Sequence, residues 1–461
     1  MKKTLISLAA VLLLALPLRA QQKNETSEYN WNAVDSLVNK QYYDQAYKLS
    51  QQLFQQAQQS HNSHQCLVAA YHIAMIGATY RENNTDSIIA TYRQLLPHLQ
   101  SSDLQVAQLL LANQYSSYYY HNRYRISQNL PSDEENLDHC FWSANRFRDT
   151  VATLIYQALG NSHLLLSTPS TDYEPLITCQ TGKDDNRTPT LFEVMLDVAL
   201  NIYKQLNYAK LTTSDFANPA LLYATPDRFT TMTTVAPPDS TRQMAAFLLA
   251  CLQDKERLLL QSSVPVALIA DQFTSRIEYH IPDLTAFLIE NYPMQSYRDA
   301  INFFEPSHNP CVAQFYSKLA ERYRSKGQYA EAMACIDSAL LRYPNSPGAA
   351  SCFNMRLIMT KKAISVHVND CFPSSTNQLG VLQSRNVDSV QFRIIPYVEH
   401  YNRRTLANQL DFFLKQPIVE QWGQSIAKPD SYSEINTYFV IPPIPEGKYL
   451  LITIPIGDTC K

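Results

Sequence analysis

GQYAEAMACIDSALLRYPNSP, residues 327–347, is the stretch that decides the fold of the longer part of this chain. One helix face can be traced through it at intervals of three and four residues, and that face carries Tyr329, Ala332, Ile336, Ala339 and Leu340. Gly327 stands before this helix as a break, and Pro344 stands after it as a stop. The stretch therefore predicts a helix that follows another one and packs closely on it through its small residues.

The preceding residues predict that first helix, because apolar side chains recur there at i, i+3, i+4 and i+7: Tyr316, Leu319, Ala320 and Tyr323. Residues 313–346 together resemble the tetratricopeptide repeat, with its aromatic, Leu-Ala, Tyr, Gly-x-Tyr, Ala, apolar, Ala and Pro positions. The resemblance implies a peptide-binding groove lined by the first helix, whose candidate binding residues here are Gln314, Ser317, Glu321 and Arg324. The basic and Asn side chains that clamp a C-terminal carboxylate in such grooves are missing from these places, which disfavours that ligand.

Less regular helical patterns fill the rest of residues 21–361, which we expect to form one α-helical repeat domain. KQYYDQAYKLSQQLFQQA, residues 40–57, is similar to another second helix. Further helices are expected at 67–78, 86–99, 104–126, 140–159, 191–206, 240–261 and 281–292. At about 35–45 residues per helix pair, we expect about eight pairs. Because one pair cannot bury both of its faces alone, the pairs are expected to stack into an α-solenoid.

The pattern changes after residue 361, and residues 362–461 are expected to form a β-sandwich, so the fold class is α+β. Strands are expected at 363–368, 380–386 and 389–397, with two more within 436–456 around a Pro-rich connection. This is five strands, and a sandwich of this kind normally closes with another, so its last strand is expected to be missing. Either the C-terminus is then incomplete, or the unpaired edge accepts a strand from elsewhere.

The N-terminus has the layout of a signal peptide. In MKKTLISLAAVLLLALPLRA, residues 1–20, two lysines precede a short apolar run, and cleavage is expected after Ala20. No later segment is apolar enough to span a bilayer, so the mature protein is expected in the periplasm or cell envelope. The net charge of -3 gives no reason to expect a nucleic-acid partner. YSSYYYHNRYR, residues 115–125, is better explained by tyrosines that pack on one helix face than by single-strand nucleic-acid binding.

Residues able to perform chemistry are scattered. Nine cysteines occur without any CxxC, and the chain has no HExxH, GxSxG, phosphate loop or GxGxxG motif. His61 and His64 are expected in a solvated loop, and His139 next to Cys140 points in a different direction from the thiol. We therefore expect no metal, no cofactor and no enzyme, although an enzyme of unrecognised type stays open as a third hypothesis.

The order of parts resembles the exported, helix-rich N-terminal portion of the large bacterial alpha-2-macroglobulin-like proteins. TPTLFEVMLDVALNIY at 188–203, SRNVDSVQFRIIPY at 384–397 and IPPIPEGKYLLITI at 441–454 carry the resemblance, the last two being similar to the first macroglobulin domain. It implies endopeptidase-inhibitor-like proteins with a bait region and, in some, a Cys-Gly-Glu-Gln thioester, and this chain has no such tetrapeptide. The resemblance therefore implies a short relative, or an N-terminal portion, that scaffolds or contacts other proteins. The alternative is a tetratricopeptide-like peptide-binding adaptor of the periplasm.

Overall fold

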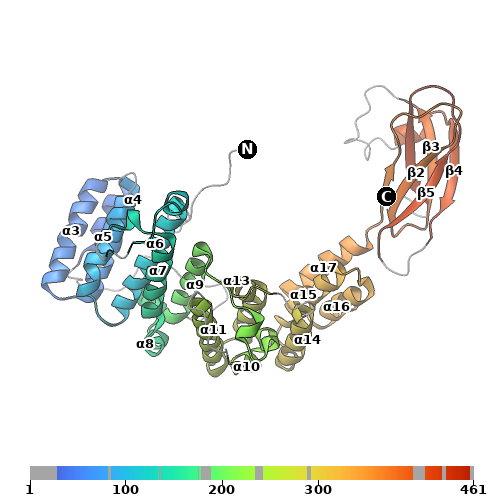
Figure 1. The fold of residues 1–461 in the computed structure, drawn as a ribbon. Helices are drawn as coiled ribbons and strands as arrows, with labels where there is room; N and C mark the ends of the chain where they lie inside the picture. The colour runs from blue at the N-terminus through green and yellow to red at the C-terminus, as the bar shows by residue number, and fades with distance from the viewer. Residues whose placement is uncertain are drawn as a thin grey trace. The chain divides into compact units, whose positions relative to one another are not determined.

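The computed structural model describes residues 29–80, 85–132, 134, 137–174, 176–177, 188–233, 242–287, 292–397, 411–427 and 432–456. By the contacts within it, the chain divides into two compact units, Met1–Asn207 and Tyr208–Lys461. Helices occupy the described chain as far as Thr360, and the first strand begins at Ala363 (Figure 1). The predicted α+β class is thus confirmed. The signal-peptide prediction falls on residues 1–20, outside the described residues.

The first unit is helical. Its elements are α2 (Trp31–Asn39), α3 (Tyr43–Gln59), α4 (Ser63–Tyr80), α5 (Thr85–Leu95), η1 (Leu96–His98), α6 (Ser101–Ile126), η2 (His139–Phe141), α7 (Ala144–Leu159), α8 (Ser162–Ser167), η3 (Ser170–Tyr173) and α9 (Leu191–Leu206). The long helix α6 packs against α5, α7 and α9. Helix α9 begins where the sequence predicts it, because Thr190 and Glu193 form a reciprocal capping box there.

The second unit begins with further helices. These are η4 (Thr213–Asp215), η5 (Pro219–Tyr223), α10 (Pro226–Phe229), α11 (Gln243–Gln261), α12 (Val266–Ser275), the π-helical turn η7 (Arg276–His280), α13 (Ile281–Leu284), α14 (Tyr292–Phe304), η8 (Glu305–Ser307), α15 (Val312–Ser325), α16 (Tyr329–Arg342) and α17 (Pro347–Thr360). One prediction was wrong here. The expected helix at 281–292 ends at Leu284, because Thr285 is extended and its backbone joins a bridge with Leu211 instead.

The predicted helix pair at 313–346 is confirmed as α15 and α16. The face predicted for α15 is buried, as are Ala332, Ile336 and Ala339 of α16. Gly327 separates the two helices with φ +73, a left-handed conformation that glycine adopts without steric cost. Helix α17 then packs on both α15 and α16. A Cβ at Gly348 would lie 2.3 Å from the backbone carbon of Ala313, so α17 can approach α15 this closely only with glycine there.

Two three-stranded antiparallel sheets complete the second unit (Figure 1). The first has the order β1-β2-β5, with β1 (Ala363–His367), β2 (Gln378–Arg385) and β5 (Ile435–Ile441). The second has the order β4-β3-β6, with β4 (Glu420–Ser425), β3 (Ser389–Pro396) and β6 (Tyr449–Pro455). Buried residues of both sheets share one core, in which the rings of Phe392 and Phe439 stack with centroids 4.3 Å apart.

The expected count of five strands was wrong, because β4 is a sixth within the described residues. Its sequence, EQWGQS, has little apolar content, and it is held by pairing with β3 and by Trp422, which stacks on Phe392 at 5.0 Å. The expectation of a missing last strand concerns the end of the chain, where residues 457–461 lie outside the described residues.

Candidate functional site

The predicted binding residues of α15 do not all face solvent. Glu321 and Arg324 are exposed near the C-terminal end of the helix. Gln314 is half-buried, and its Nε2 lies 3.3 Å from Oγ1 of Thr274 on α12. Ser317 hydrogen-bonds the thiol of Cys352 on α17. The first two residues thus join α15 to neighbouring helices, and the last two present an open surface.

An ionic cluster surrounds Glu278 next to this surface. Its Oε1 accepts a hydrogen bond from Nη2 of Arg322 on α15 at 3.2 Å, and another from the hydroxyl of Tyr297 on α14. Burial alone would raise the pKa of Glu278, but these hydrogen bonds and the charges of Lys318 and Arg322 hold it below its ordinary value. The cluster therefore fixes a carboxylate where η7, α14 and α15 meet, and it leaves Arg322 partly exposed.

A buried ion pair lies deeper in the same unit. Arg276 is fully buried, and its Nε lies 2.7 Å from Oε1 of Glu256, which is 1% exposed. The guanidinium also donates to the carbonyl oxygens of Leu222 and Ala224 and stacks over the ring of Phe229 at 4.0 Å. Each of the three guanidinium nitrogens thereby donates to a group of this chain, which marks Arg276 as a structural connector of η5, α10, α11 and η7.

In the first unit, His139 occupies a pocket of aromatic rings. Its Nε2 lies 2.7 Å from Asp86 on α5, and its ring packs edge-on against Tyr118 of α6 at 4.7 Å. Burial and the Asp138 carboxylate raise the pKa of the neighbouring Cys140 thiol. A raised thiol pKa lowers the share of the nucleophilic thiolate at neutral pH. Tyr115 and Tyr118 are buried beside Trp142 and Phe147, so the predicted packing of this tyrosine face is confirmed.

The prediction for His64 was wrong. His64 was expected in a solvated loop, but it lies in the first turn of α4, with Nδ1 3.0 Å from Oδ1 of Asp103 on α6. The hydroxyl of Tyr173 donates to the same oxygen at 2.9 Å. Burial would raise the pKa of Asp103, but hydrogen bonds from His64, Ser63 and Tyr173 hold it below its ordinary value. This network connects α4, α6 and η3.

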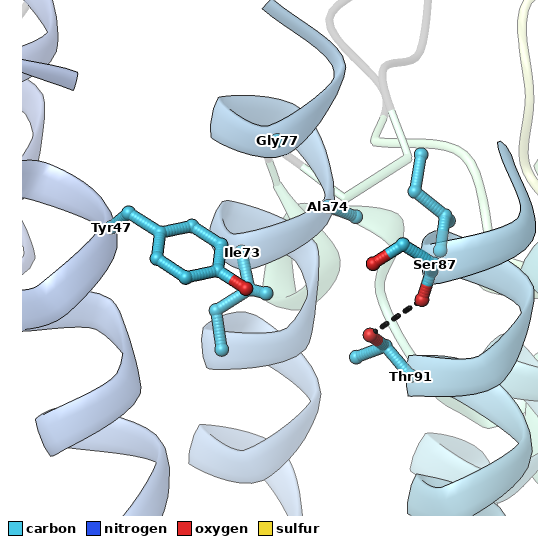
Figure 2. Close-up of a pocket in the computed structure, with 7 residues that line it drawn as sticks. Tyr47, Ile73, Ala74, Gly77, Ser87 and Thr91 are labelled. Atoms are coloured by element: carbon cyan, nitrogen blue, oxygen red, sulfur yellow. Dashed lines mark hydrogen bonds between the residues drawn. The ribbon is translucent and has the colours of Figure 1, made fainter. Parts of the chain in front are cut away.

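A small hollow between α3, α4 and α5 is shown in Figure 2, lined by Tyr47, Ile73, Ala74, Gly77, Ser87, Ile88 and Thr91. It has room for about one water molecule. The hydroxyl of Thr91 donates to the carbonyl oxygen of Ser87 at 2.8 Å, which serves the helix rather than the hollow. Within the described ranges, no group of three or more His, Cys, Asp or Glu residues is placed to hold a metal ion.

Several exposed apolar residues lie on the last two helices. Phe353, Leu357 and Ile358 of α17 are 51%, 52% and 54% exposed, and Leu341 of α16 is 82% exposed. An ion pair between Asp337 and Arg356, 3.2 Å apart, fixes the level at which the two helices meet. Leu341 follows Asp337 by one turn and Phe353 precedes Arg356 by one turn, so each lies one turn from the ion pair. We call Leu341, Phe353 and Leu357 the terminal apolar face. Ile358 does not belong to it, because at two residues after Arg356 it lies about 200° around α17 from that residue.

Comparison of the chain with protein-family models, with curated proteins and with solved structures found no match. The resemblance to macroglobulin-like proteins therefore rests on the sequence blocks alone. Across the described helices, none is both long enough and apolar enough to cross a membrane.

Proposed function

We propose that this chain is a non-catalytic exported protein of the cell envelope that acts through protein–protein contact. In this proposal the helix pairs stack as an α-solenoid, and the two sheets form a macroglobulin-like sandwich. The stacking of Phe392 on Phe439 between the sheets supports the sandwich. The packing of α17 on the α15–α16 pair supports continued helix stacking.

The terminal apolar face is the observation that carries the proposal. Large apolar side chains scattered singly over a surface are ordinary, but three that are at least half exposed on two packed helices support an interaction site. Arg356, the one charged residue of α17, pairs with Asp337, and Arg342 beside Leu341 pairs with Glu305. The face thus suits an apolar protein surface rather than a charged ligand.

The test is a pull-down from periplasmic extract with the mature chain and a double variant, Phe353→Glu with Leu357→Glu. The control is Tyr124→Glu, which places the same charge on an exposed aromatic residue of α6. We expect the wild type and the control to recover one stoichiometric protein and the double variant to lose it. Equal recovery by all three, or recovery of nothing, would contradict a role for this face.

The peptide-binding adaptor remains a second candidate, favoured by the exposure of Glu321 and Arg324 on α15. Its test is the double charge reversal of these two residues in the same pull-down. Loss of the partner from this variant, with retention by the Phe353 and Leu357 variant, would favour the adaptor over the terminal apolar face.

A further inference from the structure

We propose that the outer edge of β6 pairs with β6 of a second copy of this chain, so that two sheets join into one across a two-fold axis. This surface is separate from the terminal apolar face. Three observations support it: the register of the second sheet, the composition of the edge strands, and the antiparallel register that two copies of β6 can adopt around Leu451.

The register shows which backbone groups of β6 point outward. Tyr397 donates to Lys448 at 2.9 Å, and Ile456 donates to Ser389 at 2.9 Å, so even-numbered residues of this strand bond to β3. The N–H and C=O groups of the odd-numbered residues, Tyr449, Leu451 and Thr453, therefore face the opposite edge. In the part of the chain that the structure describes, no strand pairs with that edge.

Natural edge strands are protected by charge, by short length or by covering groups. β4 carries Glu420 and several polar side chains, and β1 has 5 residues. On β5, the carbonyl oxygen of Tyr438 already accepts a hydrogen bond from Nε2 of Gln424 at 3.0 Å. β6, YLLITIP, has 7 residues and no charge, and its protecting residue is Pro455 at the very end. β6 is thus the least protected of the four edges.

β6 carries large apolar side chains on both faces, with Thr453 as its one aliphatic hydroxyl, which restricts what can lie beside it. Tyr449 and Leu451 pack against the core between the sheets. Leu450, Ile452 and Ile454 lie on the other face, in a cluster with Ile395 and Phe413. A neighbouring strand must therefore offer apolar side chains on both faces, whereas most exposed strands alternate with polar residues. β6 of a second copy meets this requirement.

One register uses every outward group. When Leu451 faces Leu451 of the second copy, Tyr449 faces Thr453 on each side, giving three pairs with two hydrogen bonds each, about six in all. A shift by one pair in either direction sets Pro455 or Gly447 opposite an edge residue, and Pro455 has no N–H to donate. In the centred register Ile452 lies beside Leu450 of the second copy, and the apolar cluster with Phe413 continues across the axis.

The same register places Ile454 beside Lys448 of the second copy, twice across the axis. This yields a matched pair of variants. Ile454→Lys and Ile454→Glu lose the same apolar contacts within the chain. In the dimer, however, the new lysine lies beside Lys448 of the second copy and is repelled, whereas the new glutamate lies beside the same Lys448 and is attracted. We expect Ile454→Lys to weaken dimerisation at least ten-fold relative to Ile454→Glu, and Lys448→Glu to restore it in the Ile454→Lys background.

Sedimentation equilibrium of the full mature chain is the measurement. We expect the wild type to dimerise, and Thr453→Pro, which removes an outward N–H, to dissociate at least ten-fold more readily. Ser425→Pro removes an outward N–H from the opposite edge of the same sheet and is expected to leave the dimer intact. Thr453→Val keeps the N–H and controls for the side chain.

If a proline variant fails to fold, amide hydrogen exchange of the wild-type protein provides a second measurement of the same pairing. In the wild type, the amides of Leu451 and Thr453 should become protected as the protein concentration rises, while amides that bond to β3 stay unchanged. A wild type that remains monomeric at its highest soluble concentration, or equal dimerisation of Ile454→Lys and Ile454→Glu, would overturn the proposal.

Discussion

Arg276 and Glu256 form an ion pair with 2.7 Å between Nε and Oε1, at a site where neither side chain is more than 1% exposed. Burial of two charges costs desolvation free energy. For the guanidinium, the interactions with the carboxylate, two carbonyl oxygens and two aromatic rings offset that cost. The carboxylate is less well served, because its Oε2 has no hydrogen-bond partner among the described atoms. The guanidinium of Arg276 therefore has several partners besides the carboxylate, whereas the Glu256 carboxylate accepts its hydrogen bond at Oε1 from Arg276.

Replacement of Arg276 by Met should lower the free energy of unfolding by about 3–5 kcal/mol, since it leaves Glu256 buried without its ion-pair partner. The double variant Arg276→Met with Glu256→Gln should recover much of this loss, because the buried carboxylate charge is removed together with its ion-pair partner. Urea titration of the single and double variants provides the measurement. Additive losses in the double variant would contradict the coupling.

Acid should loosen the contact between α4, α6 and η3 through Asp103. The pKa of Asp103 is lowered in the folded protein, so its ionised form stabilises the fold above its ordinary pKa of about 4. That contribution is lost as the pH falls from about 4 through the lowered value. Asp103→Asn should flatten the dependence of stability on pH in this window, whereas Asp44→Asn, on an exposed ion pair, should not. Equal slopes for both variants would contradict the role given to Asp103.

The close approach of α17 to α15 predicts a large effect of one methyl group. Gly348→Ala places a Cβ against the backbone of Ala313 and Gln314, which cannot move aside as a flexible side chain would. The expected loss in unfolding free energy is about 1–3 kcal/mol. Ala350→Ser, on the exposed side of the same helix, should change it by less than about 0.5 kcal/mol. Hydrogen exchange in α15 and α17 would locate the loosened contact.

Local signals explain which parts of the fold were predictable. Thr190 and Glu193 cap α9 within four residues of sequence, and Gly327 breaks α15 from α16 by its own conformation, so both boundaries could be identified. β4 could not, because Trp422 is its one large apolar residue, and its order comes from pairing with a strand about thirty residues earlier in the sequence.

The candidate site was harder to predict than the fold. The spacing of Gln314 and Ser317 places them on one face of α15, but periodicity does not reveal that α12 and α17 cover that part of the face. The Arg276–Glu256 pair joins residues 20 apart on different helices, and no local pattern marks two charges as partners before the chain has packed. His64 was misplaced for the same reason, since its partner Asp103 lies on another helix.

Thiol reactivity should separate Cys371 from the cysteines of the helices. Cys371 is exposed, whereas Cys66, Cys251 and Cys352 are buried. Burial raises the pKa of Cys251 to about 12 and that of Cys352 to about 11, so their reactive thiolate forms are scarce at neutral pH. Under reducing conditions, brief treatment of the folded protein with iodoacetamide should modify Cys371 before Cys66, Cys251 and Cys352, which should react after addition of urea. Mass spectrometry of the tryptic peptides measures each site separately. Rapid modification of Cys251 in the folded protein would show that α11 opens to solvent and would contradict the packing described for the second unit.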